Sequence, residues 1–213
     1  GNHSMDANLN GALNNTALGH YTLSSLTEGD SNVALGYNAG GSLTTGSTNI
    51  LIGRSAGGAG TDLAYSVIIG TYAGDAINTN NSQGSVIIGY QAGTSQTAGK
   101  NTFIGYEAGR YNASGGSNTA IGYESMLGAS SNSFSNNTAV GHTSLKAVTT
   151  GSKNTALGDS AGLSSTSGDD NTVLGYEAGK VMTTQHQMTL LGSQTGMAIN
   201  NAGAQGTVAV GYR

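Results

Sequence analysis

Three glutamates occupy equivalent places in a repeated pattern, and paired carboxylates are the groups that hydrolyse glycosidic bonds. Glu107, Glu124 and Glu177 each stand two residues after a glycine that closes a five-residue phrase, NTALG in its plainest form. Glu107 and Glu124 are one repeat apart. No network of catalytic partners accompanies them in the sequence. A solvated edge is therefore the favoured interpretation, and we predict no catalytic residue and no enzyme activity.

Histidines and tyrosines share the place directly after the phrase glycine. Three copies of His20 or of His142 could converge on a metal at the axis of a trimer, since imidazole is a common ligand. No second ligand lies nearby in the sequence, so we expect neither a metal nor another cofactor. The tyrosines could stack on sugars or pack at a chain boundary, and packing is favoured. They are Tyr37, Tyr90, Tyr106, Tyr123, Tyr176 and Tyr212.

Lengthened repeats supply the candidate recognition loops. Three repeats of 19 residues carry their extra residues within 75–85, 125–137 and 197–206. Insertions in a solenoid bulge from one edge, and loops on rigid scaffolds often carry binding. Tolerated spacers remain the equal alternative. The candidate residues are Asn78, Asn80, Asn81, Ser130, Asn132, Phe134, Asn200 and Asn201.

The phrase that positions all these residues recurs twelve times, from Gly19 to Gly211, most often with a 17-residue step. Such a period means one short unit stacked many times. We predict an all-β fold, a parallel β-roll or β-solenoid of about twelve 17-residue repeats. Residues 1–5 resemble an expression-tag remnant. Residues 6–213 are expected to form a single rod. Because the chain stops directly after a fresh phrase, we expect it to be a fragment of a longer fibre.

Equivalent residues of the twelve copies form columns along the repeat. Two of these columns, three places and one place before the phrase glycine, flank the middle residue of the predicted strand. The first is β-branched in all twelve copies and the second is aliphatic in all twelve, as suits a strand. Residues two apart on a strand point to the same side, so these flanking columns are predicted to form the buried core. The core ladder is Leu18, Leu35, Ile52, Ile69, Ile88, Ile104, Ile121, Val140, Leu157, Leu174, Leu191 and Val210.

The middle column, two places before the glycine, is predicted to face the other way, yet it is also apolar. A strand that is apolar on both faces is covered on both. One coil has a single interior, so an identical neighbouring chain is the expected cover for this face. The candidate interface comprises Ala17, Ala34, Leu51, Ile68, Ile87, Phe103, Ala120, Ala139, Ala156, Val173 and Leu190.

Asparagine is the first residue of the phrase, four places before the glycine, in eight of the twelve copies, as at Asn32 and Asn154. It tolerates left-handed backbone, and stacked amides can bond from coil to coil, so a structural ladder is favoured over a sugar-binding one. The phrase glycine suits a bend or a close backbone approach. Apolar residues seven places after the glycine, such as Leu26 and Leu43, predict a second, weaker strand in each coil.

Composition excludes several classes of function. The chain has 7 basic and 11 acidic residues, without a clustered basic face, so nucleic acid is not an expected partner. No apolar run approaches the length of a membrane helix, and we expect no direct membrane insertion. There is no cysteine. Threonines in the first flanking column make an ice-binding solenoid a remote alternative. Two features oppose it, since Val and Ile interrupt the column and it shares a face with the predicted core.

The repeated phrase resembles repeats of known fibrous proteins. Ser66–Gly70 and Ser85–Gly89 are similar to the SVAIG-type phrase in the head domains of trimeric autotransporter adhesins. The 17-residue form, as in Asn118–Glu124, resembles repeats of bacteriophage tail fibres still more closely. The resemblance implies a left-handed, trimeric β-roll, although Met188 and Thr207 replace the phrase asparagine.

The expected function is a structural and adhesive segment of a trimeric extracellular fibre. A phage tail fibre or receptor-binding tail protein is the first hypothesis, and the head of a bacterial trimeric adhesin is the alternative. The expected partners are two further copies of the chain and a cell-surface glycan or protein receptor. The expected location is a virion tail or a bacterial cell surface.

Overall fold

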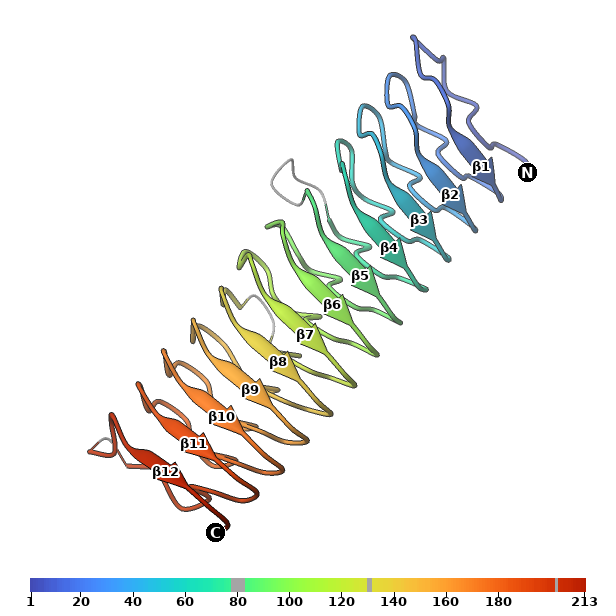
Figure 1. The fold of residues 1–213 in the computed structure, drawn as a ribbon. Coiled ribbons are helices and arrows are strands. Elements are labelled where there is room, and N and C mark those ends of the chain that lie inside the picture. Colours follow the sequence, from blue (N-terminus) through green and yellow to red (C-terminus); the bar gives the residue numbers. More distant parts are fainter. Residues whose placement is uncertain (78–82, 130–131, 202) are drawn as a thin grey trace. The chain divides into compact units, whose positions relative to one another are not determined.

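A computed structural model describes residues 1–77, 83–129, 132–201 and 203–213, and the chain divides into two compact units, Gly1–Ile104 and Gly105–Arg213. The described residues contain no α-helix; each phrase forms a three-residue strand (Figure 1). Unit 1 contains β1 (Thr16–Leu18), β2 (Val33–Leu35), β3 (Ile50–Ile52), β4 (Val67–Ile69), β5 (Val86–Ile88) and β6 (Thr102–Ile104). Unit 2 contains β7 (Thr119–Ile121), β8 (Thr138–Val140), β9 (Thr155–Leu157), β10 (Thr172–Leu174), β11 (Thr189–Leu191) and β12 (Val208–Val210).

Within each unit the strands are parallel and follow one another in chain order. The register keeps phrase positions opposite each other even where the repeat length changes. Ile68 lies opposite Ile87 across a 19-residue step, and Ile87 lies opposite Phe103 across a 16-residue step. The turns therefore absorb the extra residues. The prediction of an all-β parallel solenoid with 17-residue repeats is confirmed, whereas handedness and trimerisation remain predictions.

The middle column, and not the flanking columns, forms the core of each coil. Strand burial alternates with the middle residue inside, and Leu51, Ile68 and Phe103 are fully buried. The predicted interface was therefore wrong. Ala34, Leu51, Ile68, Ile87, Phe103, Ala120, Ala139, Ala156, Val173 and Leu190 are buried inside the chain itself, and Ala17 is half-buried.

The predicted core ladder points outward, which is the second half of the same correction. Leu18 is 63% exposed and Leu157 is 48% exposed. The physical reason is that the inside of the coil is filled by the middle column. Leu51 packs so closely on the opposite turn that a Cβ added to Gly40 would lie 2.7 Å from Leu51 Cδ1. The turn backbone thus packs directly on the middle column. The exposed members are Leu18, Leu35, Ile121, Leu157 and Val210, and the half-buried ones are Ile52, Ile69, Ile88, Ile104, Val140, Leu174 and Leu191.

Residues on the far wall complete the interior without forming a second strand. Leu26, Leu43 and Ile77, seven places after the glycine, are fully buried. These residues lie outside any strand, and the backbone just before them is a turn in which positive φ angles recur, as at Glu177 (54°) and Gly179 (56°) in a later coil. Such residues cannot sit in a pleated strand. The predicted second strand was therefore wrong, although its apolar residues do belong to the core.

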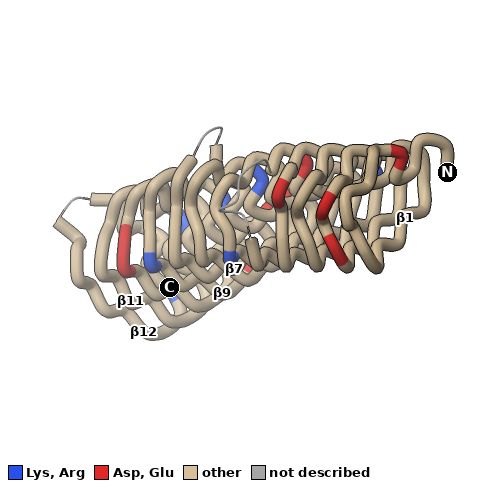
Figure 2. The backbone as a smooth tube through the Cα atoms, turned by 90° about the horizontal axis from the view of Figure 1, so that it is seen from above, with Lys and Arg blue, Asp and Glu red and all other residues tan. Residues whose placement is uncertain are grey.

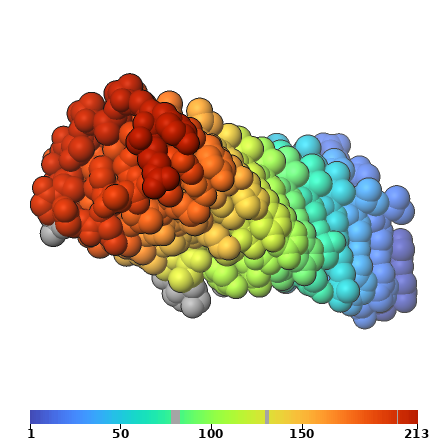
Figure 3. All heavy atoms as spheres, turned by 90° about the horizontal axis from the view of Figure 1, so that it is seen from below, coloured from blue at the N-terminus to red at the C-terminus, as the bar shows by residue number. Residues whose placement is uncertain are grey.

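The phrase glycine allows consecutive coils to approach closely. Gly158 has φ +135°, and a Cβ on it would lie 2.5 Å from the carbonyl oxygen of Gly175 in the next coil. A residue with a side chain rarely adopts this φ angle, and its Cβ would overlap the Gly175 carbonyl, so glycine is required here. On the face seen in Figure 3, the coils of each unit accordingly lie directly against one another. The predicted close backbone approach is confirmed.

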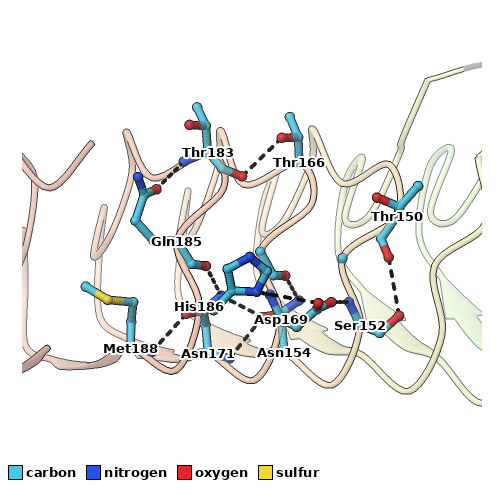
Figure 4. A network of polar contacts seen from close by, with 12 residues as sticks. Thr150, Ser152, Asn154, Thr166, Asp169, Asn171, Thr183, Gln185, His186 and Met188 are labelled. Carbon is cyan, nitrogen blue, oxygen red and sulfur yellow. Dashed lines mark hydrogen bonds and ion pairs between the residues drawn. The ribbon is translucent and has the colours of Figure 1, made fainter. Parts of the chain in front are cut away.

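The asparagines form a buried amide ladder along each unit. In unit 2 the Asn154 amide nitrogen donates to Asn137 Oδ1 (3.1 Å) and to the Gly168 carbonyl (2.7 Å), and Asn171 donates to Asn154 Oδ1 (2.9 Å; Figure 4). The structural interpretation is confirmed, since these amides face inward. The left-handed residue, however, is the one before the asparagine, as at Lys153 (φ 60°).

Candidate association surface

The outward flanking columns form an apolar face on the strands of each unit. A solvated sheet face is ordinarily polar, so alternation should place Thr, Lys or Glu here. Instead the columns contain only Thr, Val, Ile and Leu, with no charged residue in any of the twelve strands. Val33, Leu35 and Ile50 remain 40–42% exposed. An apolar face of this length is a mark of an interaction surface.

The composition of this face differs between the two units. In unit 1 the first flanking column is aliphatic in four successive strands, at Val33, Ile50, Val67 and Val86. In unit 2 the same column is threonine in five successive strands, from Thr119 in β7 to Thr189 in β11. The face of unit 1 is therefore the more apolar, and that of unit 2 carries a row of hydroxyl groups.

The tyrosine column borders the same strands at their carboxyl ends. Tyr37 is 49% exposed and Tyr176 is 52% exposed. The Tyr106 and Tyr123 rings stack with centroids 5.1 Å apart, and His142 stacks on Tyr123 at 5.3 Å. In unit 1, Arg54 lies 5.7 Å from the Tyr37 ring centroid. The rings of Tyr106, Tyr123 and His142 cover one another's faces, which favours packing over an open platform for sugars at these three positions.

The three glutamates are each bonded to a cation. Arg110 donates to Glu107 (2.7 Å), Lys146 bridges to Glu124 and Lys180 donates to Glu177 (2.6 Å). The hydrogen bond from Lys146 lowers the pKa of Glu124, and the bond from Lys180 lowers the pKa of Glu177. A general acid requires a raised pKa, so the direction of these two shifts opposes a general-acid role for Glu124 and Glu177. Figure 2 shows how few charged positions the chain carries.

The histidines are not placed as a metal site within one chain. His20 packs against Tyr21, with ring centroids 4.1 Å apart, and His142 lies 3.5 Å from Asp159. Over residues 1–77, 83–129, 132–201 and 203–213, no group of three or more His, Cys, Asp or Glu side chains could hold a metal ion.

The candidate recognition loops divide into three groups. Asn78, Asn80, Asn81 and Ser130 lie outside the described residues. Phe134 is fully buried, and buried Asn132 donates to the Val148 carbonyl (2.9 Å), so both are structural residues. Asn200 and Asn201 are exposed. Of the described candidates, only the last pair lies at the surface.

Sequence reasoning missed a polar column six places before the phrase glycine. The Ser152 backbone N–H donates to Asp169 Oδ1 (2.7 Å), and the Asp169 N–H donates to His186 Nδ1 (3.0 Å; Figure 4). Each side chain caps a backbone donor in the preceding coil. The signal in the sequence was a recurrent Asp, Ser or His just before the residue with positive φ.

The comparisons add no relative. Searches against protein-family models, curated proteins and solved structures find no match for this chain. The part of the chain that the structure describes offers no helical segment with the length and apolarity of a membrane span.

Proposed function

We propose that this chain is a structural and adhesive segment of a trimeric extracellular fibre. The observation that carries the proposal is the apolar, charge-free outer face of the strands. Aliphatic side chains such as Leu35 and Ile50 are more than one-third exposed in a single chain. Covering them is favourable by about 25 cal/mol per Å². Another copy presents the same face at the same coil spacing.

The trimeric state rests on the resemblance of the repeats to those of trimeric fibres. In such an arrangement three strand faces would meet, and the turns would remain outside. The outer turns would then present each weak receptor contact three times, and avidity would strengthen binding. Exposed loop residues such as Asn200 and Asn201 are the described candidates for that contact.

A phage tail fibre or receptor-binding tail protein is the proposed class, because the 17-residue repeats of this chain resemble tail-fibre repeats more than the shorter repeats of adhesin heads. The head of a bacterial trimeric adhesin is the alternative. Both place the segment outside the cell, on a virion tail or a cell surface, with a glycan or protein receptor as partner. Neither requires catalysis, which agrees with glutamates that are each bonded to a cation.

The mass of the chain in solution tests the proposal. Light scattering without a crosslinker should give three times the 21.1 kDa of one chain. The mass should hold on dilution to micromolar concentration. A monomer would contradict the proposal, since the apolar face would then remain uncovered.

An ice-binding solenoid is the second candidate, because the structure removes one argument against it. The threonines of β7–β11 lie on the outer face, away from the core, and Thr138 and Thr155 are exposed. A rigid sheet can present such hydroxyl and methyl groups at one coil spacing, about 4.8 Å. This row could order water if the face were free.

Thermal hysteresis separates the two candidates. A monomer that depresses the freezing point, and loses this activity in Thr155→Tyr, would favour ice binding. A trimer without hysteresis would contradict it, because the same face would be covered by protein.

A further inference from the structure

We infer that Arg54, held between the rings of Tyr37 and Tyr72, binds the anionic groups of an acidic polysaccharide; the inference rests on the proposed function and names the chemistry of its receptor. The guanidinium carbon of Arg54 lies 5.7 Å from the Tyr37 ring centroid and 5.3 Å from the Tyr72 ring centroid. Tyr37 belongs to the preceding coil of unit 1 and Tyr72 to the following one.

The backbone holds these three side chains at a fixed spacing. The Ser55 N–H donates to the Tyr37 carbonyl (2.8 Å), and the Tyr72 N–H donates to the Arg54 carbonyl (2.8 Å). A guanidinium that already lies over aromatic rings loses less conformational freedom when it binds a ligand. Arg54 is nonetheless exposed, so a ligand can reach it from solvent.

Arg54 has no anionic partner in its own chain. Arg110, Lys146 and Lys180 are each paired with a glutamate. The Arg54 guanidinium, in contrast, forms neither an ion pair nor a hydrogen bond with the residues that the structure describes. Its planar fork of N–H donors matches the paired oxygens of a carboxylate or a phosphate. The free fork therefore favours a ligand with one of these anions.

The rings beside Arg54 favour a sugar as the carrier of that anion. Tyr21 is 39% exposed and Tyr37 is 49% exposed. Their rings meet at 90° with centroids 6.3 Å apart, so they are not stacked as Tyr106 and Tyr123 are. A tyrosine of this kind can pack its apolar body on the C–H face of a sugar ring while its hydroxyl bonds to the sugar. A saccharide with a carboxylate or a phosphate would satisfy the rings and the guanidinium together.

Isothermal titration calorimetry tests the site at about 0.15 M salt, where attraction between distant exposed charges is screened. The probes are tetragalacturonate, phosphorylated mannan, neutral maltotetraose and a tetraglutamate peptide, which has carboxylates without sugar rings. The wild type should bind at least one of the two anionic saccharides, and should bind the last two probes more weakly or not at all. Arg54→Gln should raise the dissociation constant by about tenfold or more, because the charge-assisted hydrogen bonds are lost.

Arg110→Gln is the matched control. Arg110 also lies over a tyrosine ring, 4.9 Å from the Tyr111 centroid, but it is already bonded to Glu107. The variant removes the same charge, and it should leave the dissociation constant unchanged. If Arg54→Gln fails to fold by circular dichroism, Arg54→Lys decides. That variant keeps the charge without the fork, so weaker binding supports the site and unchanged binding overturns it.

The outcomes separate this inference from the proposed function. Binding of an anionic saccharide that Arg54→Gln weakens and Arg110→Gln does not supports the site, and the saccharide that binds identifies the anion as carboxylate or phosphate. No binding of either anionic saccharide, equal losses in the two variants, or equal binding of maltotetraose or tetraglutamate overturns it. A wild-type trimer by light scattering that fails to bind leaves the fibre proposal standing. A monomer whose binding depends on Arg54 overturns the fibre proposal and leaves the site.

Discussion

At the scale of single residues, glycine determines how closely the backbone of one coil can approach its neighbours. The second glycine of the repeat faces the middle column, as Gly40 faces Leu51, and the phrase glycine faces the next coil. Two properties act at once at the phrase glycine, a positive φ and a contact with backbone. A flexible side chain could move aside to make room for an added Cβ, but the backbone carbonyl of Gly175, held in its turn by the Ala178 N–H, cannot. Substitution should therefore be costly there.

Gly158→Ala should lower the free energy of unfolding by about 3 kcal/mol or more, because strain and overlap add. Gly206→Ala is the matched control, since Gly206 has φ +70° and a Cβ on it would have no other atom within 4 Å. That change should cost only about 1 kcal/mol. Urea denaturation at one protein concentration measures both. Equal losses would show that the contact with Gly175 is unimportant.

At the scale of the coil, polar side chains connect each strand to the next. The Asn154 amide bonds to Asn137, Gly168 and Asn171, so each amide serves two neighbouring coils. A buried amide of this kind cannot be replaced by water, and its loss leaves several groups unsatisfied.

Asn154→Ala should destabilise the chain by about 2–4 kcal/mol, since the Gly168 carbonyl and the Asn171 amide lose their partner. Asn154→Ser should cost less, because serine occupies this column naturally at Ser66 and Ser85 and accepts hydrogen bonds there. Thermal unfolding of the two variants decides the matter. If alanine were as stable as the wild type, the ladder would not contribute to stability.

The Glu124–Lys146 pair connects two successive coils and should make stability depend on pH. The hydrogen bond from Lys146 lowers the pKa of Glu124 in the folded chain. A lowered pKa contributes stability above the unfolded value, near 4.5, that is lost as the pH falls through the folded pKa. The melting temperature of the wild type should exceed that of Glu124→Gln at pH 7, and the difference should vanish near pH 2.5. A constant difference would contradict the assignment.

The strands and their register could be predicted from the sequence, but the direction of their faces could not. A period of two shows that the flanking and middle columns oppose each other. When both are apolar, as at Ile50 and Leu51, alternation alone cannot say which lies inside. The uniform flanking columns indicated the core, yet the core column is the variable one, from Ala34 to Phe103. It varies because each coil interior fills its own space against the turns.

The same limit explains why a second strand in each coil was wrongly predicted. Leu26 and Leu43 are apolar at the right spacing, but the residues just before each of them form a turn with positive φ, as at Leu23 and Gly40. The residue type gives no sign of the positive φ at Glu177, since glutamate does not favour that region.

At the scale of the whole molecule, the outer strand face is the feature that a single chain leaves unexplained. Each unit has a filled interior and an amide ladder, and in unit 2 Glu107, Glu124 and Glu177 are each paired with a cation. The apolar face alone lacks a cover within either unit. The account therefore predicts that fold and association depend on different columns of the same strand.

Aspartate substitutions at neighbouring positions of β3 test this most directly, with light scattering as the measurement. Ile50 is 40% exposed, so Ile50→Asp should stay folded, as circular dichroism will confirm, and should fall from the trimeric mass to that of one 21.1 kDa chain. Leu51 is fully buried, and Leu51→Asp should unfold its coil by burying an unpaired charge. A folded Ile50→Asp that retains the trimeric mass, beside a wild-type trimer, would contradict the account.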